Sequence, residues 1–141
     1  MAADYVYSNR EKVSECDAIM CGNDNVASQV VNALAVQRTA GKIMVTGQDA
    51  DLEACQRIVE GTQIMTVYKP VEKLAQRAAE CAVAMAEGKE ISGADVGVIN
   101  NGMKDLPFVK LQPVMVTKEN MDEVIIDSGF HSKEEVYLNI K

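Results

Sequence analysis

The chain of 141 residues is poor in the residue types that build the commonest catalytic and metal sites. It has no tryptophan, and His131 is its only histidine. Its four cysteines show none of the close Cys and His pairs that ligate zinc, and no nucleophile–base pair is recognisable. The sequence therefore predicts no metal site, no cofactor and no enzymatic activity.

Positive charge and long apolar runs are also lacking. The formal net charge is −7, which argues against a nucleic-acid partner because binding to a phosphate backbone needs a cationic surface. No apolar run approaches the roughly 20 residues of a membrane-spanning helix. Residues 1–6 lack the basic and apolar regions of a secretory signal. The chain as written is therefore either cytoplasmic or a mature or excised piece of an exported protein.

What is present is typical of a globular protein. Apolar residues make up 48% of the chain and charged residues 25%, and the length is enough for one domain. The four cysteines permit two disulfides in an oxidising compartment. The favoured alternative is that Cys21, Cys55 and Cys81, which lie in apolar runs, are small core residues.

Residues 43–70 have the pattern of one strand–helix–strand unit. Residues 43–46 form a short apolar run with β-branched residues, which is typical of a buried parallel strand, and Gly47 ends it. Residues 64–68 predict the next strand, and Pro70 ends it because proline cannot donate a ladder hydrogen bond. The remainder of the chain is arranged around this unit.

Three longer helices are predicted, besides a short one that opens at residue 117. The helix inside the central unit follows Asp49 and Asp51, which are both suitable caps, and it stops at Gly61. Residues 26–40 and 71–87 carry apolar side chains at helical spacing.

Two further extended segments complete the pattern. Residues 17–21 predict a strand, and residues 109–117 predict an edge strand or a bulge around Pro113. Residues 88–107 are expected to form an irregular loop. Alternation of strands and helices indicates an α/β fold with a mainly parallel sheet of about four strands flanked by helices.

Two polar residues follow neighbouring strands of this sheet. Asp49 comes just after the first strand of the central unit, and Lys69 comes just after the second. Open parallel sheets bind ligands at these ends, and a carboxylate acceptor with an ammonium donor suits a small polyhydroxylated molecule. The alternative is that Asp49 only caps a helix and Lys69 is a solvated strand end. A third reading makes Lys69 a Schiff-base lysine, which needs a desolvated pocket and a partner acid or base.

Several short motifs stand in one order along the chain: Cys-Gly-Asn-Asp at 21–24, Gly-Gln-Asp-Ala-Asp at 47–51, Thr-Val-Tyr-Lys-Pro at 66–70, Asn-Asn-Gly-Met-Lys-Asp-Leu-Pro at 100–107 and Gly-Phe-His at 129–131. Together they resemble the D-xylose-binding proteins of bacterial ABC sugar importers, which belong to the group of periplasmic binding proteins that includes the ribose and galactose binders. The resemblance extends from about residue 17 to about residue 137.

The resemblance implies three sugar contacts: Asn23, Asp49 and Lys69. In these roles Asn23 offers a donor and an acceptor, Asp49 accepts from adjacent hydroxyls, and Lys69 donates. The alternative for Asn23 is a residue of the turn that starts a helix. If Asn23 faces the ligand, Asp24 and Asn25 are the expected helix caps.

The resemblance also implies a partial type I periplasmic-binding-protein lobe. Residues 1–69 and 117–141 are expected to correspond to the second lobe, and residues 70–116 to a segment that packs on a first lobe absent from this chain. The start of the second lobe, with a tryptophan-bearing segment that stacks on the sugar, is also missing. We therefore expect a fragment, a truncated product or one half of a complex. Its exposed apolar helix face at residues 71–85 would favour self-association or a chain that supplies the missing lobe.

The function implied is binding of a monosaccharide, D-xylose or a similar pentose, as part of the substrate-binding component of an ABC importer. The expected partner is the ABC permease, and the expected location is extracytoplasmic. The alternative is a sugar-sensing module that signals to a histidine kinase or a regulator, although no DNA-binding helix-turn-helix is visible. In both cases His131 is expected to be structural.

Overall fold

The computed structural model describes residues 1–140, and the chain divides into two compact units. The first unit contains residues 1–68 and 114–140, and the second unit contains residues 69–113. The helices are α1 (Ala2–Ser8), α2 (Arg10–Ser14), α3 (Asp24–Val36), α4 (Leu52–Glu60), α5 (Val71–Ala86), the wide helical turn η1 (Asp122–Ile126) and α6 (Lys133–Val136). The strands are β1 (Ala18–Met20), β2 (Met44–Thr46), β3 (Thr66–Tyr68), β4 (Val96–Asn100), β5 (Asp105–Val109) and β6 (Val114–Val116).

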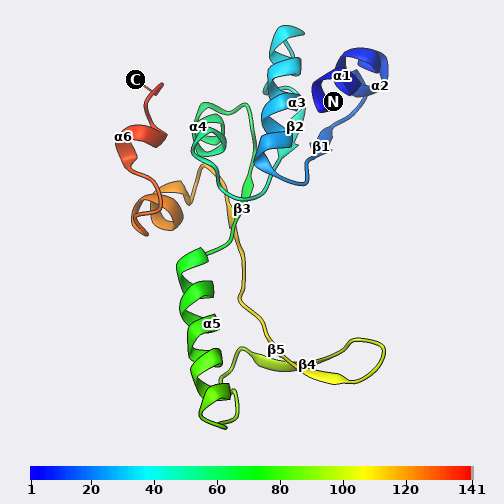
Figure 1. The fold of residues 1–141 in the computed structure, drawn as a ribbon. Coiled ribbons are helices and arrows are strands. Elements are labelled where there is room, and N and C mark those ends of the chain that lie inside the picture. The colour runs from blue at the N-terminus through cyan, green and yellow to red at the C-terminus, as the bar shows by residue number, and fades with distance from the viewer. Residues whose placement is uncertain (141) are drawn as a thin grey trace. The chain divides into compact units, whose positions relative to one another are not determined.

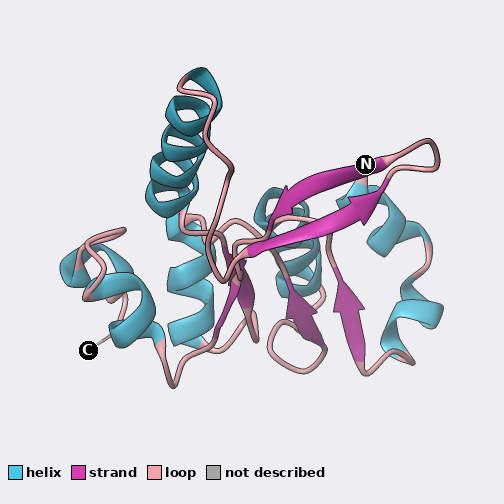
Figure 2. Ribbon diagram, turned by 90° about the horizontal axis from the view of Figure 1, so that it is seen from below, coloured by secondary structure: helices cyan, strands magenta, loops and turns pink. Residues whose placement is uncertain are grey.

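The strands of the first unit pair in both directions. β1 and β2 are parallel, with Ala18 opposite Met44, whereas β3 and β6 are antiparallel (Figure 2). A parallel bridge from Thr46 to Met65 joins β2 to the start of β3. The prediction of an α/β fold is confirmed, but the prediction of one mainly parallel sheet is wrong. The described strands form small two-stranded sheets, because each strand of the first unit is only three residues long and β6 runs opposite to β3.

Helix α3 builds the first hydrophobic cluster of this unit. It begins at Asp24 and ends at Val36, so it is shorter than the predicted range of 26–40. Its apolar residues recur at helical spacing, and the helix packs against α1 and β2 (Figure 1). The buried members of the cluster are Val6, Val13, Cys21, Ala27, Val30, Val31, Ala33, Leu34, Ile43 and Val45.

Helix α4 builds the second cluster. Asp51 is its N-cap residue, although its side chain makes no capping hydrogen bond, and Gly61 ends the helix in the left-handed conformation at φ 87°. The stop at Gly61 is as the sequence predicts, because glycine adopts this conformation without a steric penalty. The buried members of the cluster are Ala50, Cys55, Ile58, Val59, Tyr68, Val116, Met121, Ile125 and Val136.

The second unit consists of α5 and the antiparallel hairpin of β4 and β5, whose register runs from Val96 opposite Val109 to Asn100 opposite Asp105. The prediction of an irregular loop over residues 88–107 is therefore wrong. Residues 101–104 connect the two strands, and Gly102 has φ 88°. The Asn-Gly pair at residues 101–102, between two extended runs, is a hairpin signal in the sequence.

Helix α5 matches the predicted range of 71–87 closely, but none of its residues is buried. Cys81 is only half-buried, so its assignment to the core is wrong, whereas Cys21 and Cys55 are buried as predicted. Among residues 1–140, no helix is both long enough and apolar enough to cross a bilayer.

Candidate functional site

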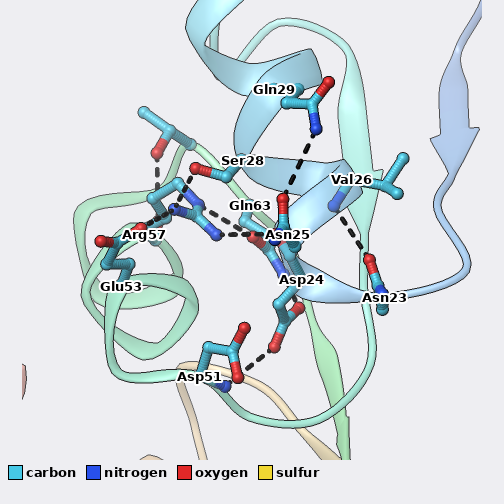
Figure 3. Close-up of polar contacts among 11 residues, drawn as sticks. Asn23, Asp24, Asn25, Val26, Ser28, Gln29, Asp51, Glu53, Arg57 and Gln63 are labelled. Carbon is cyan, nitrogen blue, oxygen red and sulfur yellow. Dashed lines mark hydrogen bonds and ion pairs between the residues drawn. The ribbon is translucent and has the colours of Figure 1, made fainter. Parts of the chain in front are cut away.

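The turn after β1 brings Asn23 to the start of α3. Its Oδ1 accepts a hydrogen bond from the Val26 backbone N–H at 2.9 Å, so Asn23 is the N-cap of the helix (Figure 3). The expectation that Asp24 and Asn25 would be the caps is wrong, because Asn23 has the extended backbone that a cap needs. The cap uses Oδ1 and leaves Nδ2 with no partner among residues 1–140, so this amide group can still donate to a ligand.

Asp24 lies directly behind this turn and is buried, with 1% of its surface exposed. Three donors converge on its carboxylate. Gln63 Nε2 donates to Oδ1 at 2.9 Å, and Oδ2 accepts from Thr66 Oγ1 at 2.8 Å and from the Asp51 backbone N–H at 3.0 Å. Figure 3 shows Asp24 reaching the backbone nitrogen of Asp51. A buried carboxylate is costly unless it is hydrogen-bonded in this way.

Asp49 lies in the loop between β2 and α4, where the backbone takes an unusual path. Asp49 has φ 105° and Ala50 has φ 56°, both in the left-handed region that residues other than glycine seldom adopt. Three successive amides fix this path. Asp49 N–H donates to the Val67 carbonyl at 2.9 Å, Ala50 N–H donates to Thr66 Oγ1 at 3.2 Å, and Asp51 N–H donates to Asp24. Such strain clusters at functional sites.

The two turns are joined to each other. The Asp24 backbone N–H donates to the Gln48 carbonyl at 2.8 Å, so the residue after Asn23 is bonded to the residue before Asp49. The structure thus brings Asn23 and Asp49 to one edge of the sheet, at the carboxyl ends of β1 and β2. Both side chains are half-buried.

Lys69 lies just after a strand of the first unit. It directly follows Tyr68, the last residue of β3, and it is the first residue of the second unit. Lys69 is exposed. The predicted position just after the end of a strand is therefore correct, and the strand concerned is the one whose Val67 carbonyl holds the Asp49 amide.

The electrostatic environment of the loop is acidic. Burial raises the pKa of Asp51, and the nearby carboxylates of Asp24 and Asp49 raise it further. This arrangement suits a neutral ligand that donates hydrogen bonds through hydroxyl groups, and it disfavours an anion. Among residues 1–140 there is no group of three or more His, Cys, Asp or Glu side chains that could hold a metal ion.

Sequence reasoning missed Arg57, which ties the two turns to α4. Its Nε donates to Gln63 Oε1 at 3.0 Å, and its guanidinium donates to Ser28 Oγ at 3.3 Å and to the Asp24 carbonyl at 3.4 Å (Figure 3). Burial lowers the pKa of Arg57. The sequence carries no signal for this role of Arg57, because its half-burial on the amphipathic helix α4 is apparent only in the structure.

His131 reaches the same loop from the C-terminal region. Its Nε2 lies 2.9 Å from the Ala50 carbonyl oxygen, and its ring packs on Phe130 with the centroids 4.5 Å apart. Phe130 in turn packs on Tyr68. These contacts agree with the expected structural role of His131, because they support the loop and bring no nucleophile to it.

Comparison with known proteins identifies relatives over nearly the whole chain. A family model described as a periplasmic binding protein domain matches residues 2–90. The D-xylose-binding periplasmic protein of Haemophilus influenzae is 46% identical over 86% of this chain and 36% of its own length. The D-xylose-binding periplasmic protein of Escherichia coli is 43% identical over 92% of this chain and 38% of its own length. The chain thus spans little more than a third of the length of these curated relatives.

Two solved structures of solute binding proteins have a fold similar to that of this chain. A carbohydrate transporter solute binding protein from Chloroflexus aurantiacus, in complex with D-glucose, has a TM-score of 0.80 and 32% identity over 95% of this chain and 40% of its own. An ABC transporter solute binding protein from Clostridium phytofermentans, with bound β-D-glucose, has a TM-score of 0.77 and 27% identity over 96% of this chain and 42% of its own.

Proposed function

The chain belongs to the periplasmic binding protein family, and on that premise we propose that it binds a monosaccharide, D-xylose, as part of the substrate-binding component of an ABC importer. The observation that carries the proposal is the strained loop that presents Asp49 at the carboxyl end of β2, beside Asn23. The relatives of highest identity reported above are named for D-xylose binding. The proposed function is binding without chemistry.

Each proposed contact has a distinct part in holding the sugar. The Asp49 carboxylate accepts hydrogen bonds from two neighbouring hydroxyls, as one carboxylate can through its two oxygens. Asn23 donates through Nδ2, because its Oδ1 already caps α3. Lys69 donates through its ammonium group from the end of β3. Hydrogen bonds to charged groups contribute about 1.5–3 kcal/mol each, so Asp49 and Lys69 are expected to dominate the affinity.

The second unit takes a different part in the proposal. Its helix α5 has exposed apolar side chains and no buried residue. This supports the proposal that residues 70–116 form a segment that packs on a further lobe. We propose that such a lobe completes the sugar site, that the loaded protein delivers sugar to a membrane permease, and that the location is extracytoplasmic, as it is for the relatives named above.

Calorimetric titration of the purified chain with D-xylose tests the proposal, with D-glucose and D-ribose as comparison sugars. Saturable D-xylose binding is expected, and Asp49→Ala is expected to weaken it at least about a hundredfold because two charge-assisted hydrogen bonds are lost. Asp17→Ala is the matched control, since Asp17 is an exposed carboxylate just before β1, at the end opposite to Asn23.

Two results would contradict the proposal. One is the absence of D-xylose binding by a folded sample, both alone and after addition of the first lobe of a D-xylose-binding relative. The other is binding that Asp49→Ala and Asp17→Ala weaken equally, because the site would then lie elsewhere.

A further inference from the structure

We propose that Asp24 is a positioning residue for Asp49: its buried carboxylate fixes the loop of residues 47–51 in the conformation that presents the Asp49 side chain. The inference rests on the proposed sugar-binding function, because it concerns how the same site is kept in shape. Asp24 itself is 1% exposed and has no access to a ligand. Any effect of Asp24 on binding therefore has to pass through the residues that it holds.

The loop needs support because its backbone is unfavourable. Asp49 and Ala50 are consecutive residues with positive φ, and alanine has no side chain that compensates for this conformation. Without outside hydrogen bonds the loop would relax toward negative φ, and the Asp49 carboxylate would leave its present position. The conformation persists only where the surroundings over-determine it.

Asp24 controls two of the three amides that hold the loop. The first control is direct, through the 3.0 Å hydrogen bond from Asp51 N–H to Oδ2. The second passes through Thr66, whose hydroxyl donates its only proton to Asp24 Oδ2 at 2.8 Å. That hydroxyl must then present a lone pair to its other neighbour, and Ala50 N–H donates to it at 3.2 Å. Asp24 thereby sets the direction of the Thr66 hydroxyl.

The remaining partner of Asp24 cannot adapt to a change of the carboxylate. Gln63 Oε1 accepts from Arg57 Nε at 3.0 Å, so Gln63 Nε2 is the atom that faces Asp24 Oδ1. All three neighbours of the carboxylate therefore donate. In Asp24→Asn one oxygen becomes an NH2 group, and wherever that group points it meets a donor.

Gly47 shows that the chain is shaped around this carboxylate. A Cβ atom at Gly47 would lie 1.9 Å from Asp24 Oδ1 and 2.8 Å from Gln63 Nε2. The position therefore has to be glycine for Asp24 to occupy its site. The loop thus begins at Gly47, beside Asp24, and ends at Asp51, which donates to the same carboxylate.

The test uses Asp24→Asn in the full chain and two measurements. The first is amide hydrogen exchange without sugar. Exchange at Ala50 and Asp51 is expected to accelerate at least about tenfold, whereas exchange at Leu34 inside α3 stays unchanged. The second is D-xylose titration, in which affinity is expected to fall about tenfold because the Asp49 hydrogen bonds to sugar are misaligned.

A double variant separates positioning from general destabilisation. In an Asp49→Asn background, Asp24→Asn is expected to cause a much smaller further loss of D-xylose affinity, because its effect passes through Asp49. A role in overall stability alone would give the same loss in both backgrounds.

A second pair of variants guards against an Asp24→Asn chain that fails to fold. Thr66→Val removes the hydroxyl at nearly constant shape and is expected to accelerate exchange at Ala50, and Thr66→Ser is expected to restore it. Wild-type exchange at Ala50 and Asp51 in the folded Asp24→Asn or Thr66→Val chain would overturn the inference. Faster exchange with unchanged D-xylose affinity would also overturn it. If the wild-type chain binds no D-xylose, either alone or with an added first lobe of a relative, the proposed function fails, and the exchange result alone decides whether Asp24 shapes the loop.

Discussion

The two units of the chain differ in how they use apolar residues. Among residues 1–140, every buried apolar side chain lies in the first unit and none lies in the second. Both units have an amphipathic helix of good length, since α3 has 13 residues and α5 has 16. The comparison teaches that an apolar helix face defines a packing surface without supplying the partner that covers it.

The units also differ in how they accommodate a carboxylate beside a glycine. In the first unit Gly47 makes room for Asp24, which is buried and has three donors. In the second unit Gly93 makes room for Asp95, which receives two hydrogen bonds from Arg77 at 2.7 and 3.0 Å. The second contact is near solvent, where an ion pair adds little stability. The second unit is thus organised by polar contacts and the first by a core.

Thiol labelling should give the largest difference between the units. Burial raises the pKa of Cys55 in α4 to about 12, and the Asp24 and Asp51 carboxylates contribute to the shift. At pH 8 its thiolate is about a thousandfold rarer than that of a thiol at the usual value of 9.0. Alkylation of the native chain, followed by peptide mass spectrometry, should modify exposed Cys16 first and leave Cys55 unmodified.

Cys81 in α5 makes this measurement a test of the comparison. It is half-buried and should react far faster than Cys55. Equal rates for Cys55 and Cys81 in the native chain would mean that α4 opens as readily as α5.

Truncation of matched leucines should give the next largest difference. Leu34 in α3 is fully buried, whereas Leu74 in α5 is 54% exposed. Leu34→Ala should lower the free energy of unfolding by about 2–5 kcal/mol, because it removes buried contacts and leaves a cavity. Leu74→Ala should change it by less than about 0.5 kcal/mol. Urea denaturation followed by circular dichroism measures both, and similar losses would show that α5 is covered in solution.

The sequence was sufficient for most elements of the first unit. Short apolar runs located β2 and β3, and Gly61 set the end of α4. Strand direction was not predictable, because the pairing of β6 with β3 joins residues that lie nearly fifty positions apart in the chain. The hairpin of β4 and β5 was missed because neither strand has a buried residue or an alternating core face.

The candidate site was predictable only where its residues follow strands. Asp49 and Lys69 were selected as candidates by their position, since ligands gather at the carboxyl ends of strands. Asp24 was interpreted as a helix cap because acidic residues favour helix starts. Its actual partners, Gln63 and Thr66, lie 39 and 42 positions later in the chain. No local pattern reveals a buried network of that separation.

Substitution of Gly47 should have a moderate effect. Gly47→Ala should lower the free energy of unfolding by about 1–3 kcal/mol, because the new methyl group overlaps a carboxylate that three donors hold in place. Gly22→Ala is the matched control in the neighbouring turn, where no atom lies within 4 Å of the added Cβ. Its effect should stay within about 0.5 kcal/mol. A thermal melt of each variant distinguishes them, and a neutral Gly47→Ala would show that Asp24 moves freely.

Self-association should respond modestly to the surface of α5. Val83 is 57% exposed on this helix, and Val36 is 72% exposed at the end of α3. If α5 lacks its cover, Val83→Lys should reduce association severalfold by placing a charge on the contact face. Val36→Lys should leave association unchanged. Sedimentation equilibrium over a range of protein concentrations measures the association. A wild-type chain that is monomeric at all of them would show that the exposed face of α5 does not drive self-association.

The smallest expected effect concerns the polar contact of the second unit. The Arg77 guanidinium donates hydrogen bonds to Asp95 and holds the pKa of that carboxyl below its usual value. Because the pKa of Asp95 is lower in the folded than in the unfolded chain, the contact stabilises the fold at a pH above the unfolded-state pKa of about 3.9. This stabilisation is lost as the pH falls through the folded-state pKa. A carboxyl-carbon NMR titration should therefore place the Asp95 midpoint below about 3.9. Arg77→Gln should raise that midpoint, whereas Arg57→Gln in the first unit should leave it in place. If Arg77→Gln leaves the Asp95 midpoint unchanged, the contact between Arg77 and Asp95 is absent in solution. The second unit would then have neither a core nor a polar contact that holds its helix to its hairpin.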